Sequence, residues 1–263
     1  KQQFAEYNES ELAGDDEKKH IPKVNGNFIW YGRGVDGTIL TPLSAIASKQ
    51  SKPTVFTSQR SQQVMDYLAT QEPAVLTYRK SDMVLAVHSD ASYLNEEEAR
   101  SRAGGHHFLS EDVPFPPNNG AIHNIAEIIK GVMSSAAEAE LGAMYINARK
   151  AVEERIILEE MGHKQPPTPL QTDNTMADGV INGKIQPKRT KAMDMRFHWL
   201  RDRECQQQFR IYWRPGKLNY ADYWTKHHPE SHHRNMRKEF LTPHIVLEML
   251  RLEQQHQKRT RAS

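Results

Sequence analysis

Apolar positions along the chain form unbroken runs in some segments and recur at helical spacing in others, an order that predicts an α/β protein. Residues 83–87 are apolar without interruption, which is typical of a strand buried on both faces of a sheet. Asp90 follows where this run ends, and a carboxylate there is costly to bury unless something positive meets it. An Asp that caps a turn is the alternative explanation for this position.

The segment before this strand predicts a small helical unit. Apolar residues recur at helical spacing from about residue 28 to residue 69, with an interruption at residues 51–54. Residues 74–78 have the pattern of a short strand. Residues 1–25 are polar and charged, and we expect them to be poorly ordered.

The segment after the strand predicts a β-meander and then a long helix. Residues 104–109 and 121–129 predict two strands in antiparallel succession, joined through a loop rich in Pro and Asn. Ser135 is the expected N-cap of the helix, Glu138 completes a capping box, and Gly162 is the expected stop.

Glu140 falls beside the apolar stripe of this helix, about 60° from its centre at 3.6 residues per turn. Unlike Glu138, it has no capping role, so it needs a partner near the core. A side chain that reaches water at the edge of the helix is the alternative.

The last third repeats the strand-then-acid arrangement. Residues 170–172 predict a short strand that ends at Asp173, and a basic amphipathic helix is expected to begin at Thr190. A strand at residues 209–213 precedes a helix that carries Asp222, where the helix dipole alone would favour an acid. A further helix is expected from Pro243, followed by a basic tail.

Composition narrows the class of protein. The 263 residues suffice for one or two domains, and the formal net charge is only +2, although basic residues gather in the last third. That asymmetry fits a polyanion partner or a solvated helix face.

The single cysteine, Cys205, excludes an intrachain disulfide and indicates a reducing compartment. No apolar run is long enough to span a membrane, and no signal peptide is evident. Because the chain starts at Lys1, we expect it to be truncated or part of a longer polypeptide.

Four carboxylates, from Asp90, Glu140, Asp173 and Asp222, come from two strand ends and two helices. If they share one pocket they repel one another, and only cations make such a cluster tolerable. Oxygen ligands of this kind suit Mg²⁺ or Mn²⁺, and two such ions about 3.5–4 Å apart are a known device for phosphodiester cleavage. The chain lacks a Ser nucleophile elbow, a P-loop and a Rossmann glycine pattern.

These motifs also have a familiar order. The chain from about residue 76 to residue 237 resembles the ribonuclease H domain of copia-type retrotransposon Pol polyproteins. The resemblance is carried by five segments: His88–Tyr93, Ser134–Glu140, Gln171–Asn174, Lys188–His198 and Tyr220–Lys226. Ala137, where many relatives carry Thr, and a proline-rich insert at residues 112–120 are departures from the family pattern.

The resemblance implies a ribonuclease H-like fold, with a mixed five-stranded sheet, helices on both faces and a small helical segment in front. It implies a polar segment at 1–25, a helical tail of the reverse-transcriptase region at 26–80, the ribonuclease H-like domain at 81–238, and a C-terminal helix and basic tail at 239–263. The family's metal-binding acids map onto Asp90, Glu140, Asp173 and Asp222. Two Mg²⁺ or Mn²⁺ ions, an RNA:DNA hybrid substrate and the rest of the Pol polyprotein are the implied cofactors and partners. The polymerase's own catalytic acids are absent, so no DNA synthesis is expected.

A groove that grips phosphates without reading sequence is expected along the basic helix. Its lining would be Lys188, Arg189, Lys191, Arg196 and Arg201. The expected location is intracellular, cytoplasmic or nuclear, with a virus-like particle as an alternative. An inactive remnant that only binds nucleic acid, and an integrase-like DNA nuclease, are the other functions considered.

A histidine cluster lies at residues 227–233. His228 and His232 are four residues apart and could bind zinc on a helix, but Pro229 between them disfavours a continuous helix beyond its first turn. A polar or phosphate-contacting surface is the preferred interpretation of these histidines.

Overall fold

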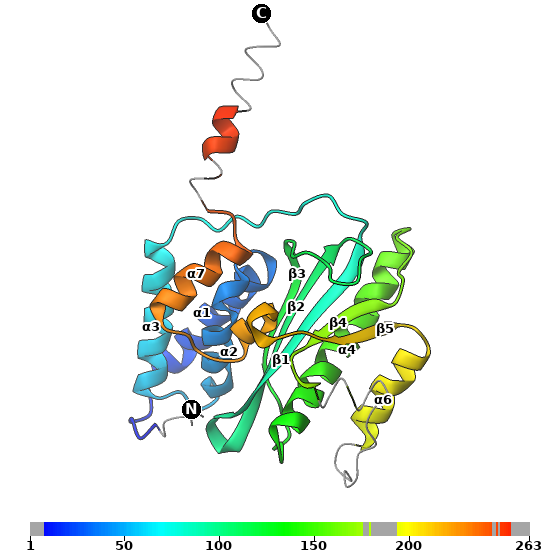
Figure 1. Cartoon of the computed structure of the whole chain (residues 1–263). Coiled ribbons are helices and arrows are strands. Elements are labelled where there is room, and N and C mark those ends of the chain that lie inside the picture. Colours follow the sequence, from blue (N-terminus) through cyan, green and yellow to red (C-terminus); the bar gives the residue numbers. More distant parts are fainter. Residues whose placement is uncertain (1–7, 176–178, 180–193, 244–245, 247, 254–263) are drawn as a thin grey trace, which may run out of the picture.

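The computed structural model describes residues 8–175, 179, 194–243, 246 and 248–253 (Figure 1). Five strands form one mixed sheet in the order β3-β2-β1-β4-β5. The strands are β1 (Val84–Glu96), β2 (Arg100–Ser110), β3 (Ala121–Ile128), β4 (Thr168–Thr172) and β5 (Phe209–Trp213). β2 is antiparallel to both β1 and β3, whereas β4 is parallel to both β1 and β5. The expected mixed five-stranded sheet is therefore confirmed.

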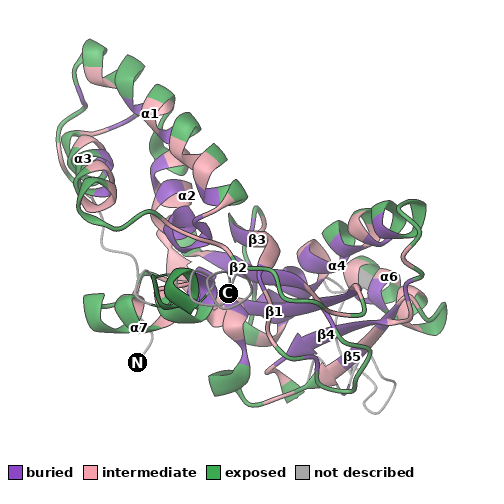
Figure 2. Ribbon diagram, turned by 90° about the horizontal axis from the view of Figure 1, so that it is seen from above, coloured by how far each residue is buried: buried purple, intermediate pink, exposed green. Residues whose placement is uncertain are grey.

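Helices cover both faces of this sheet. The α-helices are α1 (Asp15–Gly34), α2 (Leu40–Lys49), α3 (Val55–Thr70), α4 (Ala136–Glu160), α6 (Asp194–Cys205) and α7 (Glu230–Phe240). Of these, α1 and α3 pack with α2 and extend away from the strands (Figure 2). Short 3₁₀ helices add η1 (Gly37–Ile39), η2 (Glu97–Ala99), η3 (Gly216–Leu218) and η4 (Tyr220–Trp224). In Figure 2 the strands are mostly buried, while the outer faces of α1 and α4 are exposed.

β1 is the centre of the sheet and is longer than its apolar run. Residues 84–90 are all buried, and the strand continues to Glu96 with partly exposed residues. Asp90 therefore lies inside the strand, paired with Gly104 of β2, at the point where the buried half ends. The expected strand is confirmed, but its end lies six residues beyond Asp90.

α4 packs on one face of the sheet. Ser135 is its N-cap and accepts a hydrogen bond from the Glu138 amide, and Gly162 just after the helix has φ +92°, which glycine adopts without strain. Leu141 and Met144 pack with Leu85 and Val87 of β1 and with residues of α6 in the main core. The predicted helix, its Ser135 N-cap and its stop at Gly162 are confirmed, but the capping box is not formed, because Glu138 Oε2 accepts from the Ser134 N–H and hydroxyl instead of the Ser135 N–H.

The opposite face is covered by η4, α7 and the start of α2. Trp224 is fully buried there and packs with Leu40, Ala126 and Phe240. The Trp224 indole N–H donates to the Gly37 carbonyl at 2.8 Å, and Tyr223 donates to the Thr38 carbonyl at 3.2 Å. The N-terminal helices are therefore bonded directly to the sheet domain.

Three sequence expectations are wrong. Residues 15–25 are not disordered, because acidic residues fill the first turn of α1 and Ile21 is buried against α2 and α3. Residues 74–78 form no strand; this segment runs extended with Ala74 and Leu76 packed beside Trp224. The helix expected at 219–224 is a single 3₁₀ segment capped by Asn219.

Other expectations are met in part. α6 carries buried Phe197 and Leu200 as predicted, whereas residues 190–193 lie outside the described part of the chain. α7 begins directly after Pro229, which agrees with a helix that starts rather than continues at that residue. Among the described residues, no helix has both the length and the apolar character needed to cross a membrane.

Candidate active site

The structure brings three of the four predicted acids together. Asp90 comes from β1, Glu140 from the second turn of α4, and Asp173 from the residue after β4. One carboxylate oxygen of each lies within 4.8 Å of the others. The parallel pairing of β1 with β4 places Asp90 and Asp173 at the same end of the sheet.

Glu140 carries the clearest sign of a missing partner. Its Oε2 atom is buried and has no hydrogen-bond partner in the structure. A buried carboxylate oxygen without a partner is unfavourable, so this atom is suited to a ligand that brings positive charge. The donor set of this cluster is all carboxylate oxygen, which fits Mg²⁺ or Mn²⁺ rather than a thiolate- or imidazole-binding metal.

Asp222 stands at the border of this group. Its side chain is 38% exposed and pairs with Lys226 at 2.5 Å, and it is not among the three acids that lie within 4.8 Å of one another. Its negative charge nevertheless acts on Asp90, Glu140 and Asp173. The fourth acid is thus close enough to repel the other three, while Lys226 partly offsets the charge.

The pKa values of the three clustered acids are shifted upward. Burial raises the pKa of Asp90 well above its ordinary value, and the charges of Asp222 and Asp173 add to this. Burial and the charges of Asp90 and Asp173 likewise raise the pKa of Glu140 well above its ordinary value. The pKa of Asp173 is raised by burial and by Asp222. The cluster therefore resists full ionisation unless cations are bound.

Close backbone packing positions Asp90. A Cβ on Gly104 would lie 2.3 Å from the Ala221 carbonyl oxygen, so only glycine lets η4 approach β2 this closely. Asn219 caps η4 and also donates from Nδ2 to the Ser89 carbonyl at 2.9 Å. Asn219 was missed in the sequence; an Asn before a short helical segment is a recognisable N-cap, but nothing local indicates its second bond.

Asp173 is held by its surroundings after β4. The Trp213 indole N–H donates to the Asp173 carbonyl at 2.8 Å, which joins the end of β4 to the end of β5. A Cβ on Gly216 would lie 2.6 Å from Asp173 Oδ2, so the glycine leaves room for the carboxylate. These contacts direct the Asp173 side chain without neutralising it.

The predicted basic groove is only partly visible. Lys188, Arg189 and Lys191 lie outside the described residues. Arg196 lies against α4, because a Cβ on Gly142 would be 3.6 Å from its Nη1 atom, so its guanidinium is two residues along the helix from Glu140. Arg201 is exposed and lies about 140° round α6 from Arg196. The two arginines therefore project from different sides of α6, and their place in a groove stays a prediction.

The histidine cluster is more packed than expected. His233 lies 2.5 Å from both the Tyr67 and the Tyr223 hydroxyl, and the Nε2 of His228 lies 3.1 Å from the Tyr223 carbonyl oxygen. Burial, together with neighbouring His232, lowers the pKa of His228 to about 4. His233 joins α7 to α3 and η4, and His228 contacts η4, so these two histidines are packed and do not form a polar surface, whereas His227 and His232 are exposed.

Comparisons with known proteins agree with the resemblance seen in the sequence. No family model matches the chain. The chain is 24% identical over 163 residues to the retrovirus-related Pol polyprotein from transposon TNT 1-94 of Nicotiana tabacum. This match covers 62% of the chain but only 12% of that polyprotein.

Solved structures of ribonucleases H are similar at low identity. LC11-RNase H1, isolated from compost by a metagenomic approach, has a TM-score of 0.42 and 11% identity, covering 54% of this chain and 93% of its own. RNase H1 of Halobacterium salinarum has a TM-score of 0.31 and 14% identity, covering 54% and 94%. The protease-reverse transcriptase of prototype foamy virus has a TM-score of 0.31 and 13% identity, covering 65% and 26%.

The sheet itself agrees with the expectation of a mixed five-stranded sheet. The sequence match supplies the relationship to retrotransposons. The chain therefore has a mixed five-stranded sheet with helices on both faces and is similar in sequence to a retrotransposon Pol polyprotein.

Proposed function

We propose that this chain is a divalent-metal-dependent endonuclease that hydrolyses the RNA strand of RNA:DNA hybrids within a retrotransposon polyprotein. The observation that carries the proposal is the convergence of Asp90, Glu140 and Asp173, with a buried Glu140 oxygen that has no partner. A site built only for stability would not gather three like charges and leave one oxygen unpaired.

Two divalent ions, when bound, would supply an activated water and would stabilise charge on the leaving oxygen. Asp90, Glu140 and Asp173 would hold them, and Asp222 would complete the set from η4. Lys226 limits the negative charge at Asp222 and keeps a cation beside the site. No nucleophilic side chain is required, because water attacks the phosphorus.

Selection of a hybrid would come from contacts to phosphates and to the 2′-hydroxyl, which DNA lacks. Lys226 is the described basic residue that lies beside the acids, whereas Arg196 lies over Gly142, about 160° round α4 from Glu140. The Arg196 guanidinium is suited to a phosphate of the substrate.

The test is cleavage of a labelled RNA:DNA hybrid in Mg²⁺ by the full chain. Glu140→Gln should lower the rate by about 10³-fold or more, because metal catalysis supplies several kcal/mol of the barrier reduction. Asp90→Asn should behave in the same way.

The matched control is Glu153→Gln on the same helix, whose side chain is 61% exposed and pairs with Lys150. It should cleave at the wild-type rate. Wild-type protein no faster than Glu140→Gln would refute the proposal.

The pairing of Asp222 with Lys226 favours one alternative, an inactive remnant that binds nucleic acid without cutting it. Such a protein would bind hybrid with a steep salt dependence and give no product in either Mg²⁺ or Mn²⁺. Binding and cleavage measured on the same substrate separate the two functions.

We also propose that residues 26–80 correspond to the tail of a reverse-transcriptase region and that the nuclease domain follows from residue 81. In support, α1, α2 and α3 share a core of their own around Ile21, Ile39, Leu43 and Ile46. The tail is joined to the nuclease by the bonds of Tyr223 and Trp224 to η1.

A further inference from the structure

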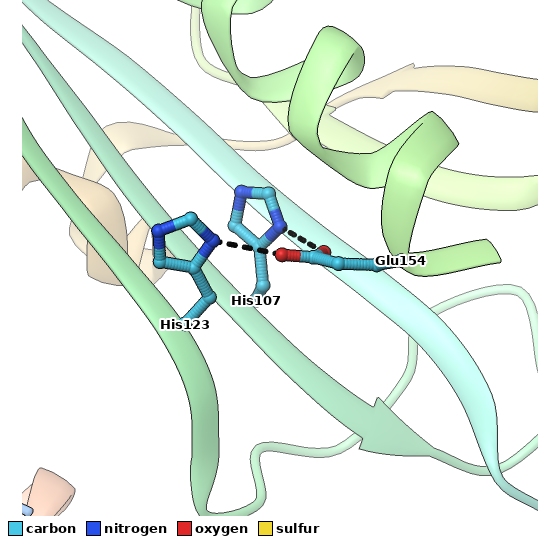
Figure 3. Close-up of side chains that lie close together, drawn as sticks. All are labelled: His107, His123 and Glu154. Atoms are coloured by element: carbon cyan, nitrogen blue, oxygen red, sulfur yellow. Dashed lines mark hydrogen bonds and ion pairs between the residues drawn. The ribbon is translucent and has the colours of Figure 1, made fainter. Parts of the chain in front are cut away.

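A second group of side chains able to hold a metal lies on the face of the sheet that α4 covers. His107 of β2, His123 of β3 and Glu154 of α4 offer ligand atoms within 4.8 Å of one another (Figure 3). His107 Nδ1 lies 2.6 Å from Glu154 Oε2, and His123 Nδ1 lies 2.8 Å from Glu154 Oε1. Each histidine therefore faces a different oxygen of the same carboxylate.

The tautomer of His107 is fixed by Asn147. Asn147 Nδ2 donates to the carbonyls of Gly104 and Ala143 at 3.0 and 2.9 Å, which can only accept, so its Oδ1 must face His107. The 3.0 Å contact from His107 Nε2 to this oxygen then requires a proton on Nε2. A neutral His107 would consequently turn the lone pair of Nδ1 toward the carboxylate.

That arrangement requires a cation between the two groups. A carboxylate and a nitrogen lone pair repel each other at 2.6 Å unless a proton or a metal ion lies between them.

The surrounding contacts are those of a metal site. A histidine that binds a metal usually donates its other ring N–H to an oxygen, as His107 does to Asn147. Gly105 keeps the Asn147 amide in place, since a Cβ there would lie 1.9 Å from its Oδ1. The orientation of the His107 ring is therefore set before any ligand binds.

We propose that His107, His123 and Glu154 form a binding site for a divalent transition-metal ion of the zinc class, distinct from the acid cluster. Two imidazole nitrogens and one carboxylate oxygen match the ligand preferences of Zn²⁺ and leave a fourth position for water. The ion would join β2, β3 and α4.

The geometry needs only a small adjustment. Bonds of about 2.1 Å in a tetrahedral site place ligand atoms about 3.4 Å apart. The two present separations, 2.6 and 2.8 Å, must therefore each open by less than an ångström. His123 and Glu154 can move this far, because their side chains are 29% and 15% exposed, whereas His107 is fully buried and fixed.

The test is calorimetric titration of Zn²⁺ into the full chain after treatment with a chelator, in excess Mg²⁺ so that the acid cluster is occupied. We expect one Zn²⁺ per chain, and a loss of affinity of about 100-fold when a ligand is removed by His123→Ala. Glu154→Gln removes a ligand from a different element and should weaken binding similarly.

His232→Ala is the matched control, because His232 is exposed and belongs to the other histidine cluster. It should leave Zn²⁺ binding unchanged. Absence of Zn²⁺ binding to the wild type, or wild-type affinity for Zn²⁺ in both His123→Ala and Glu154→Gln, would overturn the proposal. Circular dichroism of each metal-free variant shows that it folds, and either ligand variant alone suffices for the comparison. The outcome is independent of nuclease activity.

Discussion

The two clusters on the sheet show how the same burial produces opposite electrostatics. Asp90, Glu140 and Asp173 are like charges, so burial and mutual repulsion raise their pKa values. Glu154 is also largely buried, but two histidines face it, and its pKa falls to about 2. The first cluster costs stability until a cation binds, whereas in the second a proton between His107 and Glu154 takes the place of the metal ion, so that the metal-free cluster still contributes stability. A cost of this kind is expected at a functional site rather than in a structural one.

The largest effects are expected when one acid in each cluster is neutralised, which tests whether the two clusters have opposite effects on stability. In the presence of a chelator, Glu154→Gln should lower the free energy of unfolding by about 3 kcal/mol at pH 5–6, from a pKa shift between 4.5 and about 2. Glu140→Gln should leave it unchanged or raise it, because it removes a buried carboxylate whose Oε2 has no hydrogen-bond partner and which is surrounded by like charges. Urea unfolding measures both.

The pH dependence should differ in sign. The pKa of Glu154 is lower in the folded protein, so its contribution is present above about pH 4.5 and is lost as the pH falls toward 2. The difference between wild type and Glu154→Gln should shrink over that range. The raised pKa of Glu140 has the opposite effect, since ionisation at rising pH destabilises the metal-free protein. Parallel pH profiles for the two variants would show that the clusters do not differ as described.

Substitution of two adjacent glycines tests the same comparison with a smaller expected loss of stability. A Cβ on Gly104 would meet the carbonyl of Ala221, beside the acid cluster, and one on Gly105 would meet Asn147, beside the histidines. Each change to Ala should cost about 1–3 kcal/mol by overpacking. Gly104→Ala should impair cleavage more than Zn²⁺ binding, and Gly105→Ala should do the reverse. Equal effects on both readouts would contradict separate roles.

The smallest expected effect concerns the arginines of α6. Arg196→Gln should weaken hybrid binding severalfold and reduce the salt slope by about one, as expected for one phosphate contact. Arg201→Gln, on a different face of the helix, is the matched control and should bind as the wild type does. Fluorescence anisotropy at several salt concentrations measures both affinities. Equal losses of affinity in the two variants would show that Arg201 also contacts the substrate.

The sequence predicts most elements because apolar runs and caps are local. The run at residues 83–87, the N-cap at Ser135 and the stop at Gly162 all correspond to features of the structure. α1 was missed in part because its polar surface outweighs the few buried residues, such as Ile21, that hold it. Local charge does not reveal which neighbour a helix will meet.

The sites depend on contacts between distant elements, which local patterns do not contain. The family resemblance grouped the four acids. The structure was needed to show that three of them lie close together and that Asp222 lies outside this group. The histidine site was not predicted, although Glu140, Asn147 and Glu154 recur every seven residues and so share one side of α4. The pairing of His107 with His123 was hidden because the register of β2 and β3 shifts at His107.

The indole of Trp224 finds its acceptor on Gly37, in a segment that the family resemblance would assign to a different enzyme. In a fragment that starts at residue 81, the Trp224 indole N–H would lose its acceptor in an apolar environment, and the apolar surface that Leu40 now covers would be exposed. The nuclease domain and the helices that precede it would therefore have to be expressed and purified together as one folding unit.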